Sequence, residues 1–169
     1  MKRLIAISLL SLMASAAHSA EKFTDGQVSQ ILTTRNDGEV LLARHVLDNS
    51  KNAAVKEFAQ HMLDDHSLNN MQKKNITSTK AITGEESWKS AELQKEISAS
   101  QKKIFALKGK ALDIAYIDDQ IKIHEGMVEG IQQNLIPVAK EPALKKHLEM
   151  TVRKDEIHLN QARAVRWTL

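Results

Sequence analysis

The sequence predicts an all-α protein, an up-and-down four-helix bundle with one additional, less regular helical segment. Apolar residues recur at steps of three and four along most of the 169 residues, and no stretch alternates in the manner of a strand. Aromatic residues make up only 4% of the chain, and both prolines, Pro137 and Pro142, flank one short connector. Because each amphipathic helix needs a partner for its apolar face, and most connectors are short, a bundle is the economical architecture.

The first two helices are predicted at residues 25–47 and 53–76. Thr24 and Gln27 form a capping-box pattern at the start of the first helix. Its middle contains the sequence Asn-Asp-Gly at residues 36–38, which are weak helix formers and leave room for a kink. The apolar residues of each helix follow one face, so both helices are expected to bury one side.

The later part of the chain predicts three more helical segments. A segment at about 86–107 carries apolar residues at helical spacing, but its polar content makes its ends hard to place. Gly109 separates it from a long helix that starts near Ala111. The final helix begins near Glu141, with Pro142 in its first turn, where the missing amide proton does no harm.

The first residues have the pattern of an export signal. Lys2 and Arg3 precede the apolar stretch 4–13 and a run of small residues, so we expect a signal peptide at 1–19, cleaved after Ser19 or Ala20. The mature chain would then be a single helical-bundle domain at 20–169 in the periplasm. No later stretch is long enough to span a membrane, and the absence of cysteine excludes disulfides and thiolate ligands.

The charge pattern argues against a nucleic-acid partner. The formal net charge is +3, and two of the positive charges, Lys2 and Arg3, belong to the predicted signal peptide. Acidic and basic residues are interspersed, and the short basic runs have no aromatic residues beside them to stack on bases. We therefore expect a mixed-charge, solvated surface.

Three histidines occupy positions where the apolar face of a helix should continue. His66 follows Met62 by four residues, and His124 stands between Ile121 and Val128 on the same face. His158 belongs to the last helix, and Glu39 takes the equivalent place in the first. One carboxylate and three imidazoles directed toward a common bundle axis predict a metal site with Glu39, His66, His124 and His158 as ligands.

Other interpretations of these residues stay open. Arg35 lies one turn before Glu39 and offers an ordinary ion pair. The histidines could equally form a metal-free polar layer in the core of a module that binds an envelope protein. If a metal does bind, Asp65 and Asp155 are candidates for orienting the imidazole rings through hydrogen bonds.

The ligand types narrow the metal and its use. Three imidazoles and one carboxylate suit zinc, copper, iron or manganese and disfavour calcium and magnesium, which prefer oxygen ligands. No serine–histidine–acid spacing, phosphate-binding glycine loop or nucleophilic cysteine is present. The sequence thus favours non-catalytic metal buffering or envelope stress protection, with a metal-dependent oxidase as a further alternative.

Two motifs resemble a known exported bacterial family. Phe58-Ala59-x-x-Met62-x-x-Asp65-His66, and Leu107-x-Gly109-x-x-Leu112-Asp113-x-x-Tyr116 followed by His124, are similar to the family domain of unknown function 4142, whose members are often labelled outer membrane proteins. The resemblance implies a ferritin-like four-helix bundle. Its glutamate in the first helix and histidines in later helices map to Glu39, His66, His124 and His158.

The chain departs from the ferritin pattern in one respect. A di-iron ferritin site has a Glu-x-x-His pair in each of two helices, whereas Leu63 and Ile121 stand three residues before His66 and His124. Only Asp155 and His158 form an acid-x-x-His pair. This difference favours a single-metal site over a two-metal one and speaks against ferroxidase chemistry.

Overall fold

The computed structural model describes residues 22–169, and the predicted signal peptide lies outside the described residues. Within these residues five α-helices follow one another, with a π-helical turn, η1, before the last. No strand occurs among residues 22–169. The elements are α1 (Asp25–Asn49), α2 (Ala53–Thr79), α3 (Trp88–Phe105), α4 (Gly109–Gly130), η1 (Ile131–Leu135) and α5 (Pro142–Trp167).

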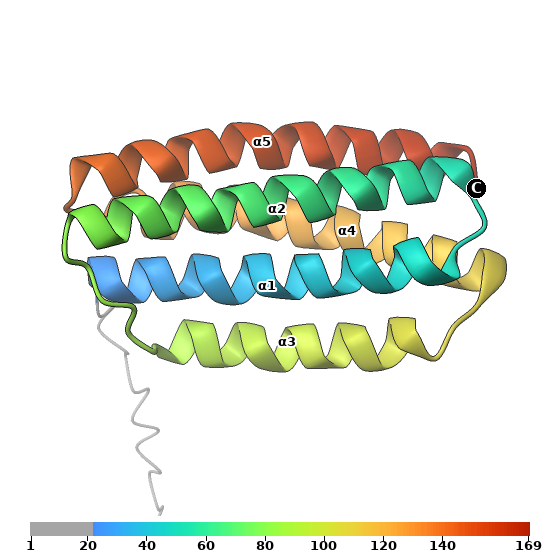
Figure 1. Ribbon diagram of the computed structural model, residues 1–169, viewed down its shortest axis with the longest axis horizontal. Helices are drawn as coiled ribbons and strands as arrows, with labels where there is room; N and C mark the ends of the chain where they lie inside the picture. Colours follow the sequence, from blue (N-terminus) through green and yellow to red (C-terminus); the bar gives the residue numbers. More distant parts are fainter. Residues whose placement is uncertain (1–21) are drawn as a thin grey trace, which may run out of the picture.

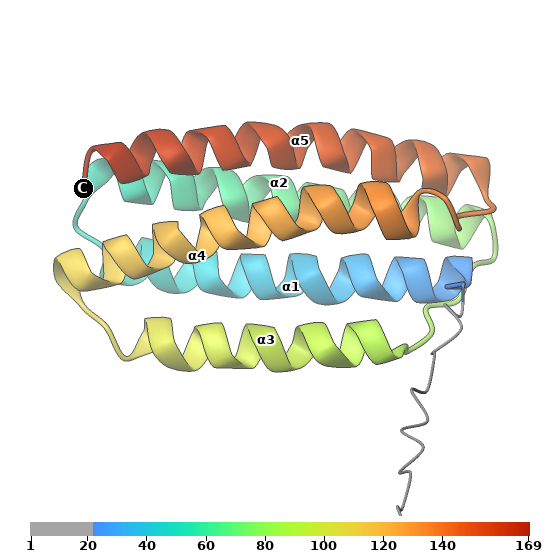
Figure 2. The ribbon, with the colours of Figure 1, turned by 180° about the vertical axis from the view of Figure 1, so that it is seen from behind.

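Four of the helices form a bundle, and the remaining one, α3, packs outside it. The closest helix pairs are α1 with α2 and α4 with α5, and α2 with α5 closes the bundle. Consecutive helices run in opposite directions, and α3 carries the chain from the end of α2 to the start of α4 (Figures 1 and 2). The bundle helices α1, α2, α4 and α5 therefore run up, down, down and up, which is the ferritin-like arrangement with one long crossover.

The capping box predicted at the start of α1 is present. The Thr24 hydroxyl accepts a hydrogen bond from the Gln27 amide, and the Gln27 side chain accepts one from the Thr24 amide. The helix continues without interruption through residues 36–38. Gly38 serves packing there, because a Cβ atom at this position would lie 2.7 Å from Cδ1 of Ile97 in α3.

The start of α4 is set by the second family motif. Gly109, its first residue, has a φ of +57°, a conformation that glycine adopts without steric penalty. One turn later, the Asp113 carboxylate accepts a 2.6 Å hydrogen bond from the Ser50 hydroxyl at the α1–α2 turn. This buried contact ties α4 to the end of α1, and the helix starts two residues earlier than the sequence pattern indicated.

The apolar core is divided into two clusters by a polar layer. One cluster includes Leu42, Phe58 and Tyr116, and the other includes Leu32 and Leu148. In each bundle helix, buried polar residues fall between the two clusters. This central layer consists of Asn36 and Glu39 of α1, His66 of α2, Gln120 and His124 of α4, and Asp155 and His158 of α5.

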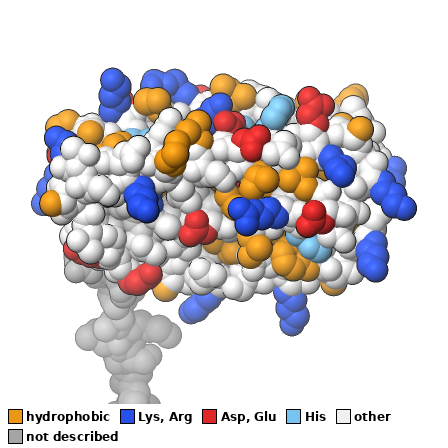
Figure 3. All heavy atoms as spheres, in the orientation of Figure 1, with side chains coloured by type: hydrophobic (Ala, Val, Ile, Leu, Met, Phe, Trp, Pro, Cys, Tyr) orange, Lys and Arg blue, Asp and Glu red, His pale blue; other side chains and the backbone are white. Residues whose placement is uncertain are grey.

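The visible surface carries both signs of charge. Lysine and arginine side chains alternate with aspartate and glutamate over the face shown in Figure 3, with apolar side chains between them. Among residues 22–169, no helix combines the length and apolarity that crossing a membrane requires.

Two glycines offer a matched test of the packing between α1 and α3. Gly126→Ala in α4 should raise the free energy of unfolding by about 0.5–1 kcal/mol, because an added Cβ meets nothing within 4 Å there. Gly38→Ala should instead lower it by about 1 kcal/mol, because displacing Ile97 outweighs the gain in helix propensity. Urea unfolding of both variants measures the difference, and equal stabilisation by the two would contradict the close packing of α3 on Gly38.

Candidate metal centre

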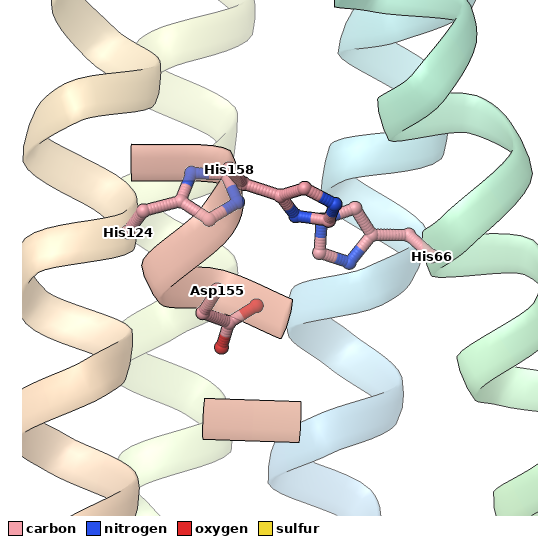
Figure 4. Close-up of side chains that lie close together, drawn as sticks. All are labelled: His66, His124, Asp155 and His158. Atoms are coloured by element: carbon pink, nitrogen blue, oxygen red, sulfur yellow. The ribbon is translucent and has the colours of Figure 1, made fainter. Parts of the chain in front are cut away.

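Four side chains of the central layer converge on one point. His66 from α2, His124 from α4, and Asp155 and His158 from α5 turn toward one another between the helices (Figure 4). One potential ligand atom from each lies within 4.8 Å of those of the other three, and all four side chains are buried. The ring centroids of the three histidines are 5.2–5.7 Å apart. These four residues are called the cluster below.

Two of the histidines have one ring nitrogen bound to an unambiguous acceptor. Nδ1 of His124 lies 2.8 Å from the backbone carbonyl oxygen of Gln120, one turn earlier in α4. Nε2 of His158 lies 2.8 Å from the carboxylate of Asp65 in α2. Because a carbonyl and a carboxylate only accept, these nitrogens carry the protons, and the opposite nitrogen of each neutral ring holds a lone pair.

The third histidine, His66, pairs with an amide. Its Nδ1 lies 2.9 Å from Oδ1 of Asn36, which is fully buried in α1. The Asn36 amide nitrogen is used in hydrogen bonds to Asn69 and Asn70 of α2. The amide oxygen of Asn36 therefore faces His66 and accepts the Nδ1 proton.

One polar atom of each cluster residue has no hydrogen-bond partner among the described residues. A buried acceptor without a donor is unfavourable by about 1–3 kcal/mol, and native structures contain few of them. Here four occur together around one point. The atoms are Nε2 of His66, Nε2 of His124, Nδ1 of His158 and Oδ2 of Asp155.

Burial keeps the histidines of the cluster neutral. It lowers the pKa of His66 well below its ordinary value, and the neighbouring His124 and His158 lower it further. It lowers the pKa of His124 to about 3, although the hydrogen bond to the Gln120 carbonyl acts in the opposite direction. For His158 burial also lowers the pKa, partly offset by Asp65. All three rings are consequently neutral at pH 7, as metal ligation requires.

The pKa of the Asp155 carboxyl group is shifted in the opposite direction, upward. Burial raises its pKa well above the ordinary value, and the nearby Glu39 raises it further. Asp65, which is half-buried, is held charged: burial raises its pKa, but hydrogen bonds from His158 and Lys154 outweigh that effect and lower it. Arg35 offsets the rise in the pKa of Asp155 only in part, and the cluster itself contains no cation beside this carboxyl group.

Glu39 lies in the same layer but outside the cluster. Its carboxylate accepts a 2.6 Å hydrogen bond from the side-chain amide of Gln120. Burial raises the pKa of Glu39 to about 7, although Arg35 and Gln120 lower it. Arg35 itself forms its ion pair with Glu96 of α3, at 3.4 Å, and not with Glu39. The structure therefore puts Asp155, and not Glu39, beside the three histidines.

The remaining sequence candidates fall into two groups. Asp65 accepts the hydrogen bond from His158, the orienting position considered for it. Asp155, considered for the same role, instead contributes a potential ligand atom. Two further histidines lie outside the cluster: His61 is exposed, whereas His147 is buried and its Nε2 lies 3.3 Å from Oδ1 of Asn69.

Sequence reasoning missed Asn36, whose side-chain amide holds His66, and Gln120, whose side-chain amide donates to Glu39. His124 is held by the backbone carbonyl of Gln120, which any residue at that position would supply. Asn36 was interpreted only as a weak helix former, and Gln120 was not singled out. Both nevertheless carry a detectable signal, because each is a polar residue three or four positions from a seam residue, Glu39 or His124, and faces the same side of its helix.

The fold and the cluster define an all-α bundle with a buried histidine–aspartate centre. The chain belongs to the family domain of unknown function 4142, whose sequence pattern matches residues 10–165. It is also similar to the crystal structure of a DUF305 protein from Streptomyces coelicolor, provisionally described as secreted. That similarity has 14% sequence identity, covers 80% of this chain and 87% of the other, and has a TM-score of 0.68. At such identity it shows the fold alone. No curated protein matches the chain.

The raised pKa of Glu39 makes stability depend on pH. The group ionises near pH 4.5 in the unfolded chain but near pH 7 in the fold, so its contribution is present below pH 4.5 and lost as pH rises through 7. Between pH 5 and 8 this loss should amount to about 2 kcal/mol. Glu39→Gln should remove that part of the pH dependence in urea unfolding of metal-free protein. If the free energy of unfolding of the variant changed with pH as steeply as that of the wild type, the pKa of Glu39 would not be raised in the fold.

Proposed function

We propose that the protein binds one transition-metal ion through His66, His124, His158 and Asp155. The role we infer is metal buffering or protection of the cell envelope from metal-related stress. The proposal differs from the sequence-based ligand set in one member, with Asp155 in the place of Glu39.

The observation that carries the proposal is the set of four unpartnered atoms. Each cluster histidine has one nitrogen occupied by a hydrogen bond and the other bare, and Oδ2 of Asp155 is also without a partner. The four residues each offer a ligand atom within 4.8 Å of those of the others. A hydrogen-bonded polar layer without a metal would be expected to pair these groups with one another, because an unmet buried acceptor is destabilising. A cation would satisfy all four at once.

The ligand set fits a small transition-metal ion. Three imidazole nitrogens and one carboxylate oxygen suit zinc, copper, iron or manganese, and four-coordinate tetrahedral geometry is typical of zinc. Bonds of about 2.0–2.1 Å would bring the ligand atoms to roughly 3.3 Å from one another, which requires small side-chain rotations from the present spacing of up to 4.8 Å.

A closed set of four protein ligands favours storage or buffering over catalysis. All four side chains are buried, and the hydrogen bonds of His124 and His158 hold their rings in one orientation. Catalytic zinc sites typically leave one coordination position to water or substrate. No catalytic residue is therefore proposed.

We further propose that the protein works outside the cytoplasm. Support comes from the signal-peptide pattern at residues 1–19 and from the similarity in fold to a protein provisionally described as secreted. In a Gram-negative cell, this export would place the protein in the periplasm, where a pool of exchangeable metal needs buffering.

Metal binding should be measurable on protein purified without a histidine tag. Addition of zinc, copper(II), iron(II) or manganese(II) to chelator-treated protein should give saturation at one ion per chain for at least one of them. At a free concentration of 100 times Kd, binding would stabilise the fold by about 2.7 kcal/mol and raise Tm by about 5–10 °C.

His124→Ala should weaken binding more than about 100-fold, since it removes a ligand and leaves a gap in the centre. His61→Ala is the matched control, because His61 is an exposed histidine of α2 outside the cluster. The proposal would be ruled out if none of the four metals bound to the protein or changed its Tm. Equal loss of binding in His124→Ala and His61→Ala would also rule it out.

Acid should release the metal only well below the range typical of exposed histidines. Burial lowers the pKa of all three cluster histidines from the ordinary 6.5, so protons compete for the ring nitrogens at lower pH in the fold than in the unfolded chain. Half-release is expected below about pH 6 in a chelator-free titration followed by metal analysis. In the metal-free protein, the contribution of the three histidines to stability should fall as pH drops below 6.5, because the unfolded chain takes up those protons first. Release centred above pH 6.5 would contradict a buried site.

A further inference from the structure

Of the Asn-Asp-Gly sequence in the middle of α1, Asn36 contacts the cluster, through His66. Among the hydrogen-bond partners of the three cluster histidines, Asn36 is the one that could act either as an acceptor or as a donor. The acceptors of His124 and His158 are a carbonyl and a carboxylate, whereas a side-chain amide can present either an oxygen or an NH2 group. Something else must therefore determine which way Asn36 faces.

Two chains of hydrogen bonds lead away from Asn36, and both end in a group that accepts. In the first, the Asn36 amide donates to Oδ1 of Asn70 at 3.0 Å, and the Asn70 amide donates to the Asp37 carboxylate at 2.8 Å. Asp37 is exposed and shows no donor of its own when ionised. The Asn70 amide must therefore give its NH2 group to Asp37 and its oxygen to Asn36.

The second chain runs through α5. The Asn36 amide donates to Oδ1 of Asn69 at 2.8 Å, and the Asn69 amide donates to the Thr151 hydroxyl at 2.8 Å. The hydroxyl in turn donates to the backbone carbonyl of His147 at 3.0 Å. A hydroxyl can reverse its direction and a carboxylate cannot, so the Asp37 end is the stricter of the two.

We propose that these two hydrogen-bond chains, which begin at the surface carboxylate of Asp37 and at the His147 carbonyl, fix the tautomer of His66 and leave its Nε2 lone pair facing the cluster. Asp37, Asn70 and Asn69 are thus positioning residues that act through Asn36. That the lone pair then meets a metal rests on the proposed function, whereas the tautomer itself does not.

The alternative tautomer would disturb the network at several points. Turning Asn36 over would bring its oxygen against the oxygens of Asn69 and Asn70, so these two amides would have to turn as well. The turned Asn70 would then place its oxygen against the Asp37 carboxylate, where neither group can donate. Asn36 itself is fully buried, so water cannot repair its own contacts, whereas the Asn70–Asp37 pair lies at the surface.

The ability of His66 to bind a metal ion depends on which of its ring nitrogens carries the proton. With the proton on Nδ1, the ring offers Nε2 to the centre, where it has no partner among the described residues. With the proton on Nε2, the same ring would aim an N–H group at the other bare acceptors and could not bind a cation without first losing or moving that proton.

Nuclear magnetic resonance of metal-free protein tests the inference directly. Long-range 1H–15N correlation spectra of neutral imidazole distinguish the Nδ1–H from the Nε2–H form. Wild-type His66 should be in the Nδ1–H form, the opposite of the form that predominates in free neutral histidine. A wild-type His66 in the Nε2–H form would overturn the inference without any variant.

Variants then test the two ends of the network. Asp37→Ala is a surface change and should raise the ratio of Nε2–H to Nδ1–H by about fivefold. Asp37→Ala with Thr151→Val should raise it further, because the second change removes the hydroxyl that links Asn69 to the His147 carbonyl. Zinc affinity, measured by chelator competition, should fall about tenfold in the double variant. The matched control is Asp64→Ala, which removes an exposed carboxylate of α2 that bonds only to Gln60.

The results separate this inference from the proposed function. A double variant whose His66 tautomer ratio equals that of Asp64→Ala would overturn the positioning role. A shifted tautomer in a protein that binds no zinc, copper, iron or manganese would uphold it while ruling out the metal site. A shifted tautomer with zinc affinity unchanged from the control would overturn the claim that the network serves metal binding.

Discussion

The rest of the structure depends on how a helical core accommodates four polar groups away from water. An apolar cluster lies on each side of the central layer, so His66, His124, Asp155 and His158 cannot reach solvent. One nitrogen of each histidine is hydrogen-bonded to the protein, whereas the other nitrogen and Oδ2 of Asp155 have no partner among the described residues. Neutral imidazoles and a raised pKa at Asp155 allow the metal-free fold to exist, but they leave the centre with unmet acceptors. We propose that a bound cation meets them all.

Every helix of the bundle contributes side chains to the central polar layer. Helices α2, α4 and α5 supply the cluster, and α1 supplies Asn36, which orients one ring. Gln120 connects the centre to Glu39, which itself stays outside the cluster. Helix α3 lies outside the bundle and contributes none of these groups, yet Gly38 lets it approach α1 closely beside the layer. This division explains why residues unfavourable for helix formation stand together at the middle of α1.

Much of the architecture could be predicted from the sequence because it depends on periodicity and capping. The helices, the capping box of Thr24 and the inward direction of His66, His124 and His158 all follow from residue spacing. The choice between Glu39 and Asp155 does not, because both are buried, and only the three-dimensional packing decides which carboxyl group lies beside the histidines. The hydrogen-bond network through Asn36 was also out of reach, since it depends on which amides of α1 and α2 meet across the helix interface.

The most direct test of the central claim is a crystal structure of the metal-loaded protein, with diffraction data collected on both sides of the metal's absorption edge. The account predicts one anomalous peak per chain, bonded to Nε2 of His66, Nε2 of His124, Nδ1 of His158 and a carboxylate oxygen of Asp155. A peak located elsewhere, or ordered water in the centre of a crystal soaked with the metal, would contradict it.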